Sequence, residues 1–172
     1  MVDGQARRSE IEELRLVVAA YVAAGADESV QRVVTAVHRL SRRLNQWYDR
    51  QLADLDVSTN EWLVINELAR SGDNQALTPS QLAASANVAP SSMTHRLDRM
   101  AERGLITREP DSANRTRVLV RMTDQGWQVY GSAIRESSLV EADLMSGLEH
   151  DQVDQLASLL EQVITGLDEA DL

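Results

Sequence analysis

Two short helical patterns meet at Asn87, and this junction constrains the fold more strongly than any other feature of the sequence. The first pattern covers residues 79–86 and opens with Thr78-Pro79-Ser80-Gln81, a capping box with proline at the first helical position. The second pattern covers residues 90–103. The few residues between them leave room only for a tight turn, so we predict two helices joined at a corner.

The residues at the corner fit a helix–turn–helix. That motif needs a small residue where the helices cross, a left-handed residue in the turn and an apolar residue after it, and Ala83, Asn87 and Val88 occupy these places. Asn is a residue that tolerates a positive φ. An ordinary corner between two helices would fit equally well. The two short strand patterns that follow, residues 105–109 and 117–121, favour a winged helix–turn–helix because they predict a hairpin.

The remaining periodic patterns are helical. Apolar residues recur at intervals of three and four over residues 9–24, 28–52 and 58–71, and again over residues 123–147 and 156–167. Phe is absent and aromatic residues make up 3% of the chain, so Leu, Val and Ala must fill the core, which favours helices over strands. The predicted fold is mainly α with a small β-hairpin wing.

Charge is distributed unevenly along the chain. The net charge of −10, taken alone, argues against a nucleic-acid partner because phosphate contacts need cations. Residues 78–126, however, carry 7 Arg against 5 acidic residues, whereas residues 127–172 carry 1 Arg against 10 acidic residues. The predicted helix–turn–helix and hairpin therefore hold the positive excess, which favours double-stranded DNA as a partner.

The second helix of the junction has one apolar face, Met93, Leu97 and Met100, which should point into the core. Its outward face has short hydroxyls and a histidine near the helix start, which suits entry into the major groove. A solvated helix face is the alternative, and Asp98 and Glu102 would keep the end of this helix away from phosphates. The residues of this segment that we predict to bind DNA are Thr78, Ser80, Ser91, Ser92, Thr94, His95, Arg99, Asn114, Arg115 and Arg117.

The predicted hairpin tip carries Asn114 and Arg115, with Arg117 directly after it. An arginine on a narrow loop beside a reading helix is placed to enter the minor groove, where the negative potential is strong. Asp111 is expected to orient Arg115. A charged turn without a partner is the alternative.

The order of these motifs resembles the MarR family of transcription regulators. The resemblance runs from about residue 28 to residue 168, and its landmarks are Gly104-Leu105-Ile106, Asn114-Arg115 and Met122-Thr123-Asp124-Gln125-Gly126. It implies an intertwined helical dimer, two winged lobes that read a palindromic site, and control by a small ligand that is often phenolic or anionic.

The C-terminal patterns fit such a dimer. The row Leu156, Leu159, Leu160, Val163, Ile164 and Leu167 has too little partner surface within one chain, and stripes of that extent normally mark an interface. We expect a homodimer. The resemblance divides the chain into a helical extension, residues 1–27, and a MarR-type domain, residues 28–169, with residues 78–126 as its DNA-binding lobe and residues 28–55 and 127–169 as its dimerisation helices.

Arg96 is the candidate for a ligand site. It lies beside the apolar face of its helix, so its guanidinium should be partly buried and need an anionic partner. A carboxylate ligand would supply one, and an ion pair with Asp or Glu of another helix is the more common alternative. The chain also resembles the urate-responsive branch of the family in its N-terminal helix, Arg96 and Trp62, but Leu63 stands where that branch has Asp. We therefore expect a small aromatic or anionic effector near Tyr21, Trp47, Trp62 and Arg96.

Other classes of function find no support. The absence of cysteine excludes disulfides and thiolate metal sites. The three histidines fall on different predicted helices without spaced carboxylate partners, so we predict no catalytic residue, no metal, no cofactor and no enzyme. The longest apolar run, residues 16–24, is shorter than the roughly 20 residues of a membrane span, and we see no signal peptide. We expect a cytoplasmic protein with no membrane partner.

The predicted function is a ligand-responsive repressor that binds a palindromic operator as a homodimer. A winged-helix protein that acts mainly through protein–protein contacts is the alternative, and the acidic tail Asp168-Glu169-Ala170-Asp171 would suit it.

Overall fold

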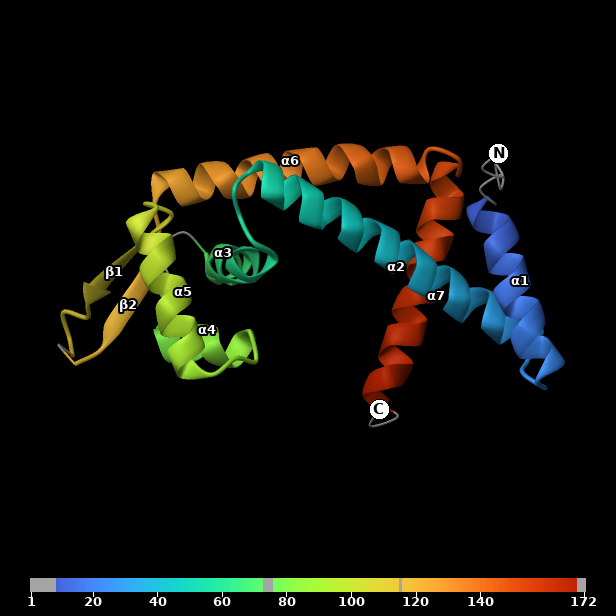
Figure 1. The fold of residues 1–172 in the computed structure, drawn as a ribbon, viewed down its shortest axis with the longest axis horizontal. Helices are drawn as coiled ribbons and strands as arrows, with labels where there is room; N and C mark the ends of the chain where they lie inside the picture. The colour runs from blue at the N-terminus through green and yellow to red at the C-terminus, as the bar shows by residue number, and fades with distance from the viewer. Residues whose placement is uncertain (1–8, 73–75, 115, 170–172) are drawn as a thin grey trace, which may run out of the picture. The chain divides into compact units, whose positions relative to one another are not determined.

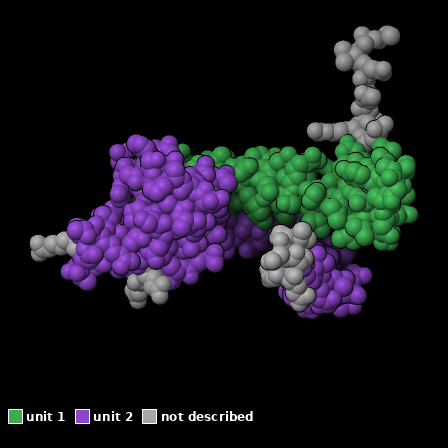
Figure 2. All heavy atoms as spheres, turned by 90° about the horizontal axis from the view of Figure 1, so that it is seen from below, with its two compact units in different colours: residues 1–58 green, residues 59–172 purple. Residues whose placement is uncertain are grey.

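The structure is a computed structural model that describes residues 9–72, 76–114 and 116–169. The chain forms two compact units, residues 1–58 and residues 59–172, which we call the first and second units (Figure 2). The described residues are mostly helical, with one antiparallel two-stranded sheet (Figure 1). The mainly α class with a hairpin wing is therefore confirmed.

The first unit consists of two helices packed against each other, α1 (Glu10–Ala23) and α2 (Glu28–Asp54). Ser9 and Glu12 form a capping box at the start of α1, in which the Ser9 amide donates to Glu12 Oε2 at 2.8 Å and the Glu12 amide donates to Ser9 Oγ at 3.3 Å. The Asp27 carboxylate accepts from the Val30 amide at 2.9 Å and starts α2. Both helices begin within two residues of their predicted starts because these caps are local.

The second unit holds the remaining elements: α3 (Thr59–Ser71), α4 (Pro79–Ser85), α5 (Pro90–Glu102), β1 (Ile106–Pro110), β2 (Val118–Met122), α6 (Asp124–Met145) and α7 (His150–Glu169). The two strands pair in antiparallel register from Ile106 opposite Met122 to Pro110 opposite Val118. Leu77 extends this sheet by one bridge, since its amide donates to Val120 O at 3.1 Å and its carbonyl accepts from the Val120 amide at 2.8 Å. Both strands lie one residue later than predicted, because the end of α5 and its turn occupy the chain as far as Leu105.

The core of the second unit lies where α3, α4 and α5 meet the sheet. Its side chains are at most 2% exposed and come from helices and strands alike: Val64, Ile65, Leu68, Leu82, Met93, Leu97, Met100, Leu105, Ile106 and Val120. None is aromatic, as the composition predicts. This core fixes α5 and the hairpin as one lobe.

Candidate nucleic-acid interface

The turn between α4 and α5 has the expected geometry. Asn87 adopts a φ of 50°, in the left-handed region, as predicted. The Val88 amide donates to Ala83 O at 3.0 Å and the Asn87 amide donates to Ala84 O at 3.1 Å, which closes the corner with main-chain hydrogen bonds. Ala83 is 4% exposed, so a larger side chain would meet the crossing helix. These contacts fix the angle at which α5 leaves α4.

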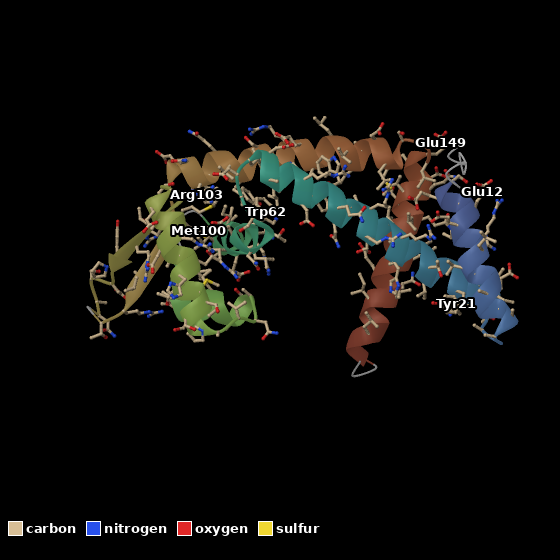
Figure 3. All side chains as sticks on the ribbon, viewed as in Figure 1. Glu12, Tyr21, Trp62, Met100, Arg103 and Glu149 are labelled. Carbon is tan, nitrogen blue, oxygen red and sulfur yellow. The ribbon has the colours of Figure 1, made fainter. Side chains whose placement is uncertain are left out.

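Helix α5 presents a polar face to solvent. Met93, Leu97 and Met100 are fully buried, and Figure 3 shows Met100 on the side of α5 near α3. The predicted reading residues are exposed, namely Ser91, Ser92, Thr94, His95 and Arg99. Thr94 Oγ1 donates back to Pro90 O at 3.0 Å, so its hydroxyl is partly committed to the helix. The predicted division of α5 into a buried and an exposed face is confirmed.

The wing tip is a tight, internally bonded loop. The Asp111 amide donates to Arg117 O and the Arg117 amide donates to Asn114 O, each at 2.8 Å. Asn114 Oδ1 accepts from Thr116 Oγ1 at 2.7 Å and from the Thr116 amide at 3.1 Å, so this residue shapes the tip as well as lining it. Arg115, and with it the expected contact to Asp111, lies outside the described residues.

A polar pocket joins the wing to the start of α4. It has a volume of about 430 Å³ and is lined by Thr78, Pro79, Ser80, Asn114, Thr116, Arg117 and Val118. The pocket therefore brings together two pairs of residues predicted to bind DNA, Thr78 with Ser80 and Asn114 with Arg117, although more than 30 positions separate the two pairs. Thr78 itself is 9% exposed, and its Oγ1 accepts from the Gln81 amide at 3.3 Å in the predicted capping box. The Thr78 hydroxyl is thus used in the N-terminal cap of α4, whereas the side chains of Ser80 and Arg117 are exposed to solvent.

The base of the wing is joined to the start of α6 by hydrogen bonds. Thr123 Oγ1 donates to Gly104 O at 2.6 Å and accepts from the Gly126 amide at 3.0 Å. A Cβ added at Gly126 would lie 2.3 Å from Leu105 O, so only glycine permits this approach of helix to strand. The sequence landmarks Gly104-Leu105-Ile106 and Met122 to Gly126 are thus in contact where the base of the wing meets the start of α6.

Two ion pairs in this lobe were not predicted from the sequence. Arg108 on β1 donates to Asp98 on α5, and Arg103 Nη1 lies 3.1 Å from Glu61 Oε1 of α3. Glu61 is 6% exposed, which explains why this acid needs a cation. Since the partners are 10 and 42 positions apart, no local spacing rule indicates them.

Arg96 is buried as expected, at 7% exposure. Its Nη1 donates to the main-chain carbonyl of Asn60 at 3.0 Å, and no described acidic residue forms an ion pair with it. The ion pair considered for Arg96 from the sequence is therefore absent from the described part of the chain. Arg103, the residue directly after α5, forms an ion pair with Glu61 instead. Figure 3 shows Arg103 at the C-terminal end of α5 and Trp62 on α3.

The aromatic candidates fall in different units. Trp62 stacks on Tyr130 of α6, with ring centroids 5.7 Å apart and an angle of 19° between the rings, which ties α3 to α6. Tyr21 and Trp47 belong to the first unit, where Trp47 and Tyr48 form a T-shaped pair with ring centroids 5.5 Å apart. Trp62 thus has a packing role in the second unit, and Tyr21 is 51% exposed.

Comparison with known proteins supports a winged helix–turn–helix in this lobe. Residues 55–115 match the family model described as MarR family. A curated relative, the HTH-type transcriptional regulator PecS of Dickeya dadantii (strain 3937), is 27% identical over 131 residues, which are 76% of this chain and 79% of PecS. In this lobe the chain is similar to the MarR family of transcription regulators.

Solved structures of MarR regulators share the fold. Wild-type MarR from E. coli, in its apo form, is 27% identical, with a TM-score of 0.57 over 73% of this chain and 95% of that one. A point mutant of S. aureus MepR, bound to an oligodeoxyribonucleotide, is 18% identical, with a TM-score of 0.63 over 78% of this chain and 97% of that one. The winged helix–turn–helix of this chain is thus seen in solved structures of MarR regulators.

Neither a membrane-spanning helix nor a metal site occurs among the described residues. None of the helices that they form is long and apolar enough to span a membrane. They also contain no group of three or more His, Cys, Asp or Glu residues arranged to hold a metal ion.

Proposed function

We propose that this chain is a DNA-binding regulator of the MarR type, which binds a palindromic operator as a homodimer and represses transcription from it. The observations that carry the proposal are the polar pocket that joins the start of α4 to the wing tip and the exposed polar face of α5. The MepR structure that is bound to an oligodeoxyribonucleotide has the same fold, which supports DNA as the partner of this surface.

In this proposal the N-terminal half of α5 enters the major groove. Ser91, Ser92, Thr94 and His95 are short or compact side chains on the exposed face, so the helix can approach base edges closely. Arg99 lies one turn further along the same face and suits a phosphate contact. Ser80 and Arg117, beside the polar pocket, would hold the backbone between the two grooves, and Arg115 would reach the minor groove.

A homodimer is supported by apolar side chains that the described chain leaves exposed. On α7, Leu156, Leu159, Leu160, Val163, Ile164 and Leu167 are between 37% and 60% exposed. No residue of α7 whose side chain is described is buried. A helix with such a face needs a partner, and a second copy with two-fold symmetry would also present two α5 helices to one palindromic site.

Repression follows if the dimer occupies a promoter. The test is a gel shift with the intergenic DNA upstream of the chain's own gene, followed by in vitro transcription from that DNA. We expect specific binding that weakens as salt rises and a transcript that decreases when the protein binds. Failure to shift this DNA even at low salt would instead favour the alternative function through protein–protein contacts.

A second part of the proposal is an aromatic or anionic effector that weakens DNA binding. It is favoured by Arg96, a buried cation on α5 whose partner among the described residues is a main-chain carbonyl. An anion at this position would act directly on the helix that we expect to read DNA. Salicylate and urate are suitable probes: a raised melting temperature and weakened DNA binding, both lost in Arg96→Ala, would support the effector. If neither acid does either, the effector near Arg96 is refuted.

A further inference from the structure

The first turn of α3 contacts both α6 and α5, the helix that we expect to read DNA. We propose that residues 60–62 of this turn are a positioning element: they set the direction of α5 relative to α6, and so determine which separation of DNA half-sites the dimer prefers. This inference rests on the proposed function, since it concerns a dimer on a palindromic operator. The three helices all belong to the second unit.

Two arginines connect this turn to α5. Arg96, within α5, donates from Nη1 to the Asn60 carbonyl at 3.0 Å. Arg103, directly after α5, donates from Nη1 to Glu61 Oε1 at 3.1 Å. Arg96 is 7% exposed and Glu61 is 6% exposed, so water cannot easily replace either of them. The two arginines are about two helical turns apart, and contacts at two such points fix the direction of α5 as well as its distance from α3.

The next residue connects the same turn to α6. Trp62 stacks on Tyr130 of α6, with ring centroids 5.7 Å apart and 19° between the ring planes. Trp127, also on α6, forms a T-shaped pair with Tyr130 at 5.8 Å. Aromatic pairs of this kind favour defined geometries, so the Trp62 ring should follow a tilt of α6. Consecutive residues of a helix point in directions about 100° apart, which allows one turn to reach two different helices.

The chain directly after α5 is also held by the start of α6. Gly104, the neighbour of Arg103, accepts at its carbonyl from Thr123 Oγ1 at 2.6 Å, and Thr123 is the N-cap of α6. Loss of the ion pair between Arg103 and Glu61 would leave this hydrogen bond at the base of the wing in place. The end of α5 could then pivot about the wing base, because α3 would no longer hold it from the other side.

The direction of α5 matters because a two-fold dimer doubles any change in it. A tilt in one lobe is repeated in the other, so the separation of the two α5 helices changes by twice the displacement. One base pair added between half-sites moves them about 3.4 Å apart and turns them by about 35°. A dimer with loosely held α5 helices should therefore accept half-site separations that the wild type rejects. A residue that only stabilises the fold would lower the affinity for every separation alike.

The experiment uses the full-length protein and synthetic operators that share their half-sites, taken from the DNA that the protein shifts. The spacer between half-sites has its natural length or is one base pair shorter or longer. Fluorescence anisotropy gives the ratio of the affinities for the natural and the altered spacers. We expect Arg103→Gln, Glu61→Gln and Trp62→Leu each to reduce this ratio at least about threefold. Combining Arg103→Gln with Glu61→Gln should add little, because either change breaks the same contact.

Arg70→Gln is the matched control. Arg70 also forms an ion pair on α3, with Glu67 at 3.3 Å, but both partners lie on α3 and the Arg70 side chain is 74% exposed. This variant should keep the wild-type ratio. Urea unfolding shows whether each variant folds. The Arg103 side chain is 33% exposed, so Arg103→Gln still tests the proposal if Glu61→Gln, at a buried position, fails to fold.

Two results would overturn the proposal and leave the proposed function intact. One is an unchanged ratio in Arg103→Gln with all affinities lowered alike, since the ion pair would then only stabilise the fold. The other is an equal change of the ratio in Arg70→Gln, since the loss of any ion pair of α3 would then suffice. If the wild type bound none of these operators, the proposed function would be refuted, and this inference with it.

Discussion

Arg108 on strand β1 donates a hydrogen bond to Asp98 on helix α5, and so joins the wing to the helix that we expect to read DNA. Asp98 is the acidic residue that would otherwise face the phosphates from the middle of α5. The pair is partly solvated, with side-chain exposures of 26% for Arg108 and 48% for Asp98. Its contribution to the free energy of unfolding is therefore below about 1 kcal/mol, and its main effect is on charge at the DNA-binding surface.

Arg108→Gln should therefore weaken DNA binding more than it weakens the fold. The unpaired Asp98 carboxylate would repel phosphate, and a change of about 1 kcal/mol corresponds to about a fivefold loss of affinity. Asp98→Asn should bind at least as tightly as wild type. Fluorescence anisotropy with labelled operator DNA measures both, and urea unfolding measures stability. If Asp98→Asn lost as much affinity as Arg108→Gln, the pair would act by orienting the wing and not by neutralising charge.

Gly126→Ala should destabilise the second unit by about 1–3 kcal/mol, because its methyl group would overlap the Leu105 carbonyl. The wing base would have to move away from α6, so DNA affinity should fall as well. Gly166→Ala on α7 is the matched control, since an added Cβ there meets nothing within 4 Å. That variant should be no less stable than wild type. Equal denaturation midpoints in urea for the two variants would refute the role of Gly126 at this joint.

The structure confirmed those predictions that rest on local rules. The Thr78 cap, the left-handed Asn87 and the buried row Met93, Leu97 and Met100 each depend on residues within one or two turns of one another. Contacts between distant residues were missed, because hydrophobic periodicity gives the face of a helix but not its neighbour. Arg103 finds Glu61 across 42 positions, and nothing in either local pattern indicates the other.

The residues predicted to bind a ligand show the same limit: the sequence indicates which side chains are buried but not what they contact. Burial of Arg96 follows from its place beside the apolar row of α5, and the structure confirms it. Its partner, the Asn60 carbonyl, is a main-chain atom that every residue carries, so no side-chain pattern could indicate it. The sequence indicates Tyr21 as a ligand residue, but the pocket that Tyr21 lines becomes visible only when α1 and α2 are placed together.

The stability of variants at Asn87 should follow how well each side chain tolerates the left-handed region of φ and ψ. Asn87→Gly should match wild type within a few tenths of a kcal/mol, whereas Asn87→Val should cost about 1–2 kcal/mol because of its branched Cβ. Urea unfolding at pH 7 measures the difference. The helix–turn–helix corner would not need a positive φ in solution if the Gly and Val variants were equally stable.

The first turn of α1 should respond to acid. The Ser9 amide, which donates to the Glu12 carboxylate, is the main cause that lowers the pKa of Glu12 below its ordinary value of 4.5, and the Ser9 hydroxyl adds to the effect. A lowered folded-state pKa means that this stabilisation is present above pH 4.5 and is lost as the pH falls through the folded-state value. The Ser9 amide proton shift should therefore titrate with a midpoint below 4.5. In Glu12→Gln the same signal should not titrate, and a wild-type midpoint at or above 4.5 would contradict the capping box.

The apolar face of α7 gives the sharpest test of the dimer. Ile164 and Val163 are each 60% exposed in the single chain, so a charge there costs little in a monomer. In a dimer that buries this face, an unpaired carboxylate loses its hydration, which costs several kcal/mol and shifts the equilibrium to monomer. Ile164→Glu should therefore sediment as a monomer at concentrations where wild type is a dimer. Its affinity for a palindromic operator should fall, whereas its affinity for a half-site should not.

Gln152→Glu, on the first turn of the same helix, controls for added charge and should remain dimeric. Unchanged sedimentation of Ile164→Glu would place the dimer interface elsewhere, on the exposed valines of α2 or on α6.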